Sequence, residues 1–136
     1  MATQRTRPLS PHLTIWRWGP HMLVSILHRI TGAALTLAGL ALLTWWLMAI
    51  ADGATAYADF MGFVNYELYR LPVVKLALIG LTWAFFQHLL SGIRHLVMDT
   101  GSGFELDTNK RFAVLTLVGS LVLTLAVWVP VLGGML

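Results

Sequence analysis

Three long runs of residues without a charged side chain divide the sequence. They are 21, 18 and 25 residues long and cover residues 30–50, 76–93 and 112–136. A transmembrane α-helix needs about 20 predominantly apolar residues, and the middle run reaches that length once its flanks are included. Such segments cross lipid as helices, because every backbone N–H and C=O must be paired within the segment. The pattern predicts an all-α integral membrane protein with three transmembrane helices, at about residues 23–50, 73–98 and 112–134.

The segments outside these helices differ in composition. Residues 1–22 hold three prolines, three arginines and two histidines with little periodicity, which predicts an irregular N-terminal segment at the membrane surface or against a partner. The connection 51–72 carries an aromatic residue at every third position from Tyr57 to Tyr69. This stripe fits a short interfacial helix, or packing against a neighbour, which we favour. The connection 99–111 is a polar turn, and residues 1–136 form a single domain.

The composition supports the membrane assignment and excludes several kinds of chemistry. Hydrophobic residues make up 57% of the chain and charged residues 11%, whereas soluble domains carry roughly 25% charged residues. The sequence has no cysteine, so disulfides, thiolate metal sites and cysteine nucleophiles are excluded. It has no phosphate-binding loop, catalytic triad or zinc-protease motif, so hydrolysis and nucleotide binding have no support.

Basic residues are concentrated on one side of the predicted membrane. Four arginines lie in the N-terminal stretch that ends at Arg29, and three Lys or Arg residues belong to the second connection and its flank. The other side has only Arg70 and Lys75. The positive-inside rule places the N-terminus in the cytoplasm, or in the matrix of an organelle, and the C-terminus outside. The net charge of +3 therefore reflects orientation, and no nucleic-acid partner is expected. The first run starts late and lacks a small-residue cleavage site, so it is not a signal peptide.

A first group of polar residues lies at the start of the first helix. His21, Ser25 and His28 follow the i, i+4, i+7 spacing of one helix face, and Arg29 lies one turn beyond Ser25. A hydroxyl beside a guanidinium makes a donor pair suited to a carbonyl or carboxylate oxygen. The alternative is an arginine that reaches lipid phosphate and a serine that bonds to its own helix. The residue types alone do not decide between the two.

A second group lies on the second helix and comprises His88, Ser91, Arg94 and His95. His88 and His95 are seven residues apart, which puts them on one face about 10 Å apart along the axis. Gly92 between them leaves room for a flat group. A deep imidazole with basic groups near the water boundary suits haem, with an axial nitrogen at depth and propionates at the surface. The alternative, favoured by the spacing alone, is a histidine that packs against a neighbouring helix.

Two stretches at these groups resemble the signatures of a known family. RPLSPHLTIW at 7–16 with SILHRITG at 25–32, and HLLSGIRHLVMDTG at 88–101, are similar to the two motifs of the cytochrome b membrane-anchor subunits of succinate dehydrogenase. The resemblance covers about residues 7–130. Trp16 stands where that family commonly has a tyrosine, which leaves the motif intact. Three membrane spans are also what the resemblance implies.

The resemblance implies a haem b site shared between two chains. His88 matches the histidine that ligates the haem iron, and the second axial histidine would come from a companion anchor subunit. His95 and Arg29 match residues near the haem propionates, with His28 and Arg94 as further cofactor-binding neighbours.

The resemblance also implies a quinone site. Ser25 and Arg29 match the serine and arginine that line the ubiquinone site, which the iron–sulfur subunit and the other anchor complete. Asp99 ends the second signature and is expected to cap the helix or to pair with nearby basic groups.

The function implied is that of one of two membrane anchors in the four-subunit succinate:quinone oxidoreductase, respiratory complex II, which joins the tricarboxylic acid cycle to electron transport. The chain would be non-catalytic alone, and its partners would be the second anchor, the iron–sulfur subunit and the flavoprotein subunit. The expected location is the bacterial cytoplasmic membrane, because no organellar presequence precedes the first signature; the mitochondrial inner membrane is the alternative. Two other functions stay open at this point: the anchor of a fumarate reductase that uses menaquinone, and a cofactor-free membrane scaffold.

Overall fold

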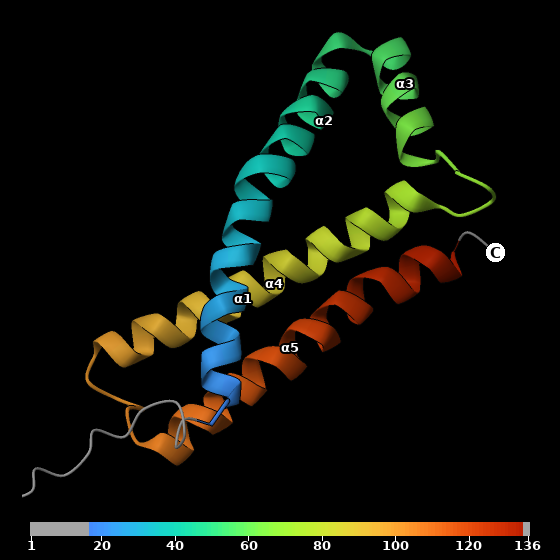
Figure 1. Ribbon diagram of the computed structural model, residues 1–136. Helices are drawn as coiled ribbons and strands as arrows, with labels where there is room; N and C mark the ends of the chain where they lie inside the picture. The colour runs from blue at the N-terminus through green and yellow to red at the C-terminus, as the bar shows by residue number, and fades with distance from the viewer. Residues whose placement is uncertain (1–16, 135–136) are drawn as a thin grey trace, which may run out of the picture.

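Three long helical spans account for most of the computed structural model, which describes residues 17–134 (Figure 1). The spans cover Pro20–Asp52, Val73–Asp99 and Leu106–Gly133, and each is long and apolar enough to cross a membrane. No strand occurs within the described part of the chain. The prediction of an all-α membrane protein with three transmembrane helices is therefore confirmed.

The first span is one continuous helix with a change of pitch in its middle. It consists of α1 (Pro20–Ala34), the π-helical segment η1 (Leu35–Gly39) and α2 (Leu40–Asp52). Pro20 occupies the first turn of α1, where its missing N–H removes no helical hydrogen bond. Residues 20–22, which were expected to be irregular, are thus helical. Residues 17–19 precede the helix, and residues 1–16 lie outside the described residues.

The connection after α2 contains a helix, α3 (Ala54–Val64), which folds back along α2 (Figure 1). The reversal takes place at Gly53, whose φ of 98° favours a residue without a Cβ. Phe60 is buried, and its ring lies 5.3 Å from that of Trp45, while the ring of Phe63 lies 4.9 Å from Trp45. Phe60 is thus the buried member of the aromatic stripe. Phe63 contacts Trp45 of α2 but is exposed, as are the three tyrosines.

The second and third spans, α4 (Val73–Asp99) and α5 (Leu106–Gly133), run antiparallel and side by side (Figure 1). Small and hydroxyl side chains of α5 are buried along this seam: Ala113, Thr116, Ser120 and Thr124. The Ser120 hydroxyl donates to Gln87 Oε1 at 2.8 Å, and both residues are fully buried. Close approach over small residues with hydrogen bonds across the interface is how helices associate in lipid.

The third helix starts six residues earlier than the position of about 112 predicted from the hydrophobic run. The helix begins at Leu106, and residues 107–111 are polar but helical, with Asp107 in the first turn, where a carboxylate is favoured by the helix dipole. Charged residues mark the end of the apolar span, but the helix continues through them. The turn between α4 and α5 is consequently short, and Gly101 and Gly103 in it have φ of 86° and 79°.

α1 packs against both α4 and α5, at the end of the molecule where α4 ends and α5 begins (Figure 1). Val24 of α1 and Ala113 of α5 are fully buried there. From this crossing α2 diverges from α4, so most large apolar side chains of α2, α4 and α5 are exposed. Lipid or neighbouring chains must cover this surface. The crossing is also where the two polar groups of the sequence meet.

Candidate functional site

Three histidines from α1 and α4 come together where these helices cross. The rings of His28 and His88 are stacked, with centroids 3.9 Å apart and planes 6° from parallel. The ring of His95 meets that of His28 edge-on at 5.2 Å. His88 and His95 lie on the same face of α4, two turns apart, and the ring of His28 from α1 contacts both.

The ring of His88 is held through its Nδ1 atom. This atom lies 3.1 Å from the backbone carbonyl of His28 and 3.3 Å from the hydroxyl of Thr31. A backbone carbonyl can only accept, so Nδ1 carries a proton and donates it. The Thr31 hydroxyl lies 2.7 Å from the carbonyl of Leu27, to which it donates, so its oxygen is free to accept from His88. The second nitrogen, Nε2, is left with a lone pair that can bind a metal.

Glycines allow the two helices to approach this closely. A Cβ atom added to Gly32 of α1 would lie 2.9 Å from Cε1 of His88, closer than carbon atoms normally pack. On α4, a Cβ at Gly92 would lie 3.9 Å from Cε1 of His28. Each helix therefore presents a glycine to the histidine of the other. The flat group that was expected beside Gly92 is, within this chain, the imidazole of His28.

The His88 side chain also lines an apolar hollow of about 410 Å³ between the first span and α4. The other residues around it are Leu35, Gly39, Leu40, Leu43, Phe85 and Leu89. Gly39, Leu43 and Phe85 also line a wider hollow of about 740 Å³ that reaches toward α3 and α5. The site can thus offer one imidazole nitrogen to a large, apolar and open space.

Ser25 and Arg29 lie on α1, one turn apart. Ser25 is partly buried and Arg29 is exposed. Neither side chain forms a hydrogen bond or an ion pair with another residue in the described range 17–134. Their donors are therefore free for a ligand or for another chain.

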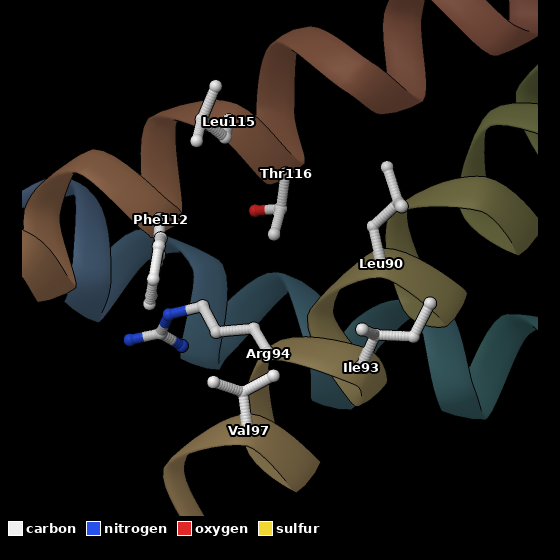
Figure 2. Close-up of a pocket in the computed structure, with 7 residues that line it drawn as sticks. All are labelled: Leu90, Ile93, Arg94, Val97, Phe112, Leu115 and Thr116. Atoms are coloured by element: carbon white, nitrogen blue, oxygen red, sulfur yellow. The ribbon is translucent and has the colours of Figure 1, made fainter. Parts of the chain in front are cut away.

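Arg94 does not join the histidines. Its side chain is buried and reaches from α4 toward Phe112 of α5 (Figure 2). The guanidinium donates to the Oδ1 atom of Asn109. Neighbouring residues on a helix point about 100° apart, so Arg94 and His95 face different elements. The arginine expected beside the haem propionates is thus placed on the α5 side. Asp99, the last residue of α4, is exposed.

Sequence reasoning missed two residues that hold these side chains. Thr31 lies one turn after His28, on the face of α1 that also carries the buried Val24, and its spacing alone does not distinguish it from a packing residue. Asn109 was assigned to a polar turn, because no spacing rule connects it to Arg94 fifteen residues earlier. The first signature stretch, residues 7–16, lies outside the described residues.

Comparisons with known proteins identify the family of the chain. The family model for the succinate dehydrogenase/fumarate reductase transmembrane subunit matches residues 3–127. The chain is 41% identical to the succinate dehydrogenase cytochrome b556 subunit of Paracoccus denitrificans over 119 residues, which are 86% of this chain and 85% of the relative. It is 38% identical to the subunit of the same name from Rickettsia conorii, over 90% of this chain and 91% of the relative.

A mitochondrial protein is also similar. The human succinate dehydrogenase cytochrome b560 subunit is 33% identical over 112 residues, which are 82% of this chain and 64% of the relative. The resemblance stated from the two sequence motifs is therefore confirmed. The chain belongs to the succinate dehydrogenase/fumarate reductase transmembrane subunit family.

Proposed function

We propose that this chain is the cytochrome b anchor of succinate:quinone oxidoreductase, respiratory complex II, and that it holds haem b together with a second anchor subunit. The observation that carries the proposal is the geometry of His88. Its Nδ1–H donates to the His28 carbonyl at 3.1 Å, which fixes the ring and leaves Nε2 as a metal ligand. The relatives named above are cytochrome b subunits of succinate dehydrogenase, which favours this enzyme over a fumarate reductase.

The residues around His88 fit a haem. The hollow of about 410 Å³ beside the ring is lined by apolar side chains, as a macrocycle requires, and it continues into a wider space. Haem would supply a one-electron redox centre beside the route to quinone. His88 would bind the iron, while His28, His95 and Arg29, toward the basic end of the crossing, would hold the propionates. A companion anchor would supply the remaining protein ligand.

Ser25 and Arg29 would form this chain's part of the ubiquinone site. A hydroxyl and a guanidinium one turn apart can both donate to a quinone oxygen. Reduction of ubiquinone to ubiquinol takes two electrons and two protons, and negative charge develops on the oxygens as electrons arrive. A guanidinium stabilises that charge. The iron–sulfur subunit would deliver the electrons after the flavoprotein subunit has taken them from succinate.

The orientation proposed from the sequence fits the fold. The start of α1, the end of α4 and the start of α5 lie at one end of the molecule (Figure 1). This end carries Arg29, Arg94, Lys110 and Arg111, so the positive-inside rule assigns it to the cytoplasm of a bacterium, or to the mitochondrial matrix. The soluble subunits and the quinone site would lie on this side.

The test of the haem site is an absorption spectrum of the purified complex. We expect a b-type spectrum in the wild type, its loss in His88→Ala, and its retention in His21→Ala, which alters a histidine of α1 outside the stacked group. A wild-type complex that assembles without haem would refute the haem assignment and favour a scaffold.

The test of the quinone site compares two acceptors in the same preparation. Ser25→Ala and Arg29→Leu should lower succinate-dependent reduction of ubiquinone and spare electron transfer to a soluble dye. Thr44→Ala and Arg111→Leu, which alter an exposed hydroxyl and an exposed guanidinium away from Ser25, are the matched controls. Equal loss of both activities in the Ser25 and Arg29 variants would mean failed assembly and would refute the assignment.

A further inference from the structure

Arg94 is a cation buried inside the membrane-spanning part of the chain. Its relative exposure is 6%. The guanidinium donates to Oδ1 of Asn109, an uncharged acceptor, and its Nε–H is buried without a hydrogen-bond partner. A buried charge is normally both paired and fully hydrogen-bonded, because desolvation is otherwise uncompensated. Arg94 satisfies neither condition with the residues around it.

The counter-charge for Arg94 is not found in the chain. Among residues 17–134 the one ion pair joins Lys110 to Asp107 at 3.7 Å, and Arg94 takes no part in it. The first 16 residues contain no Asp or Glu. An anion that neutralises Arg94 must therefore come from another molecule.

An apolar hollow lies directly beside the guanidinium. It has a volume of about 220 Å³ and lies between α4 and α5, with Arg94 and Thr116 as its polar members (Figure 2). Five apolar side chains form the rest of its wall: Leu90, Ile93, Val97, Phe112 and Leu115. Ile93 is 49% exposed and Leu115 is 63% exposed, so the hollow opens on the outer surface of the helix pair. It does not share a residue with the hollow beside His88.

Arg94 lies close to the end of α4 that faces the other basic residues. It precedes Asp99, the end of α4, by five residues, or about 7.5 Å along the axis. Lys110 and Arg111 lie at the start of α5, at the same end of the molecule. The hollow thus combines an apolar groove with a cation beside it and further basic residues at the membrane surface.

We propose that this hollow binds an anionic phospholipid. Its phosphate would accept hydrogen bonds from the Arg94 guanidinium, for which a phosphate is a well-matched bidentate partner. One acyl chain would fill the groove between Ile93 and Leu115. The proposal depends on neither haem nor quinone. It gives Arg94 a role on the α5 side of the molecule, distinct from the propionate role expected from the sequence.

The experiment is native mass spectrometry of the whole detergent-solubilised complex after delipidation and addition of phosphatidylglycerol, phosphatidylcholine or inorganic phosphate. We expect the wild type to retain phosphatidylglycerol in preference to the other two. Arg94→Gln should lower phosphatidylglycerol occupancy about tenfold, which corresponds to the loss of a charged hydrogen bond. Arg70→Gln, which alters an exposed arginine between α3 and α4, should retain the lipid.

A second pair of variants tests the groove rather than the charge. Ile93→Phe narrows the opening and should lower lipid occupancy, whereas Leu121→Phe enlarges an exposed side chain of α5 that does not line the hollow and should not. Unchanged phosphatidylglycerol occupancy in Arg94→Gln would overturn the proposal. So would a structure of the complex in which a partner subunit's carboxylate pairs with Arg94, or a shift of the haem potential in Arg94→Gln without any loss of lipid.

Discussion

Gly32 faces the ring of His88 at a distance that leaves no room for a methyl group. In Gly32→Ala the new Cβ would lie 2.9 Å from Cε1 of His88, whereas carbon atoms pack at about 3.5–4.0 Å. The ring must therefore move by about 0.6 Å or more. It is also held by the His28 carbonyl at 3.1 Å, so the movement strains or breaks this hydrogen bond.

The free energies involved can be compared. Overpacking of a filled site costs about 1–3 kcal/mol. Replacing a helical glycine by alanine contributes about 0.8–1.0 kcal/mol of intrinsic helix propensity. The two effects leave the stability of the complex little changed or lowered by up to about 2 kcal/mol. The effect on the proposed haem ligand is larger than on the fold, because the displaced ring carries the ligating nitrogen.

The assay is the absorption spectrum and midpoint potential of haem in the purified complex, together with its thermal unfolding midpoint. We expect Gly32→Ala to lose haem or to shift its potential. Gly80→Ala is the matched control, because a Cβ at Gly80 of α4 meets no atom within 4 Å. It should keep the haem spectrum and raise the unfolding midpoint slightly.

One result would refute the reasoning. If both glycine variants keep the wild-type spectrum and potential, the close contact between Gly32 and His88 does not position the ligand. A loss of assembled complex in Gly32→Ala would be distinguished from a loss of haem by the ratio of haem to flavin in the purified material.

Three further predictions concern single hydrogen bonds and an ion pair. Thr31→Val removes the hydroxyl 3.3 Å from His88 Nδ1 and should shift the haem potential, whereas Thr31→Ser should restore it; equal potentials in both variants would contradict a positioning role. Gln87→Leu removes the acceptor on α4 of the Ser120 hydroxyl, which keeps the Leu117 carbonyl at 2.9 Å as an acceptor. It should lower stability by about 0.6 kcal/mol or less, the average for such bonds in membranes, measured as a lower unfolding midpoint in detergent. Asp107→Asn removes an exposed ion pair with a lysine and a carboxylate favoured by the helix dipole, and should lower that midpoint only slightly, by the equivalent of about 1 kcal/mol or less; a larger decrease would show a network beyond the pair.

The number and class of the helices could be predicted because lipid imposes a simple rule. Any span must be about 20 apolar residues in a helix, so counting uncharged residues found all three spans. The ends of the helices were less predictable. The polar residues 107–111 belong to the helix α5, and nothing in their composition distinguishes a polar turn of helix from a polar loop. The π-helical segment Leu35–Gly39 was also not predicted, since it changes the hydrogen-bond pitch without changing hydropathy.

The site was predictable where residues share a helix and much less so where helices meet. The spacing of His88 and His95 placed them on one face of α4, but no rule of spacing puts the ring of His28 between them. The same limit applies to Arg94. Its neighbour His95 suggested a common role, yet the packing of α5 turned its side chain toward Asn109. Contacts between helices depend on crossing geometry, which a single sequence does not specify.

The crossing of α1 and α4 links the two proposed sites through one rigid element. Ser25 and Thr31 are six residues apart on α1, or about 9 Å along its axis. The quinone donors and the groups that hold His88 therefore move together whenever α1 shifts against α4. The His28 carbonyl is an acceptor that no side-chain substitution removes, so the protonation of His88 Nδ1 is set by this crossing rather than by the identity of residue 28. A substitution that alters helix separation, such as one at Gly32, should thus affect both sites. A substitution of Ser25 should affect only quinone, whereas one of Arg29 should affect quinone and the propionate contact.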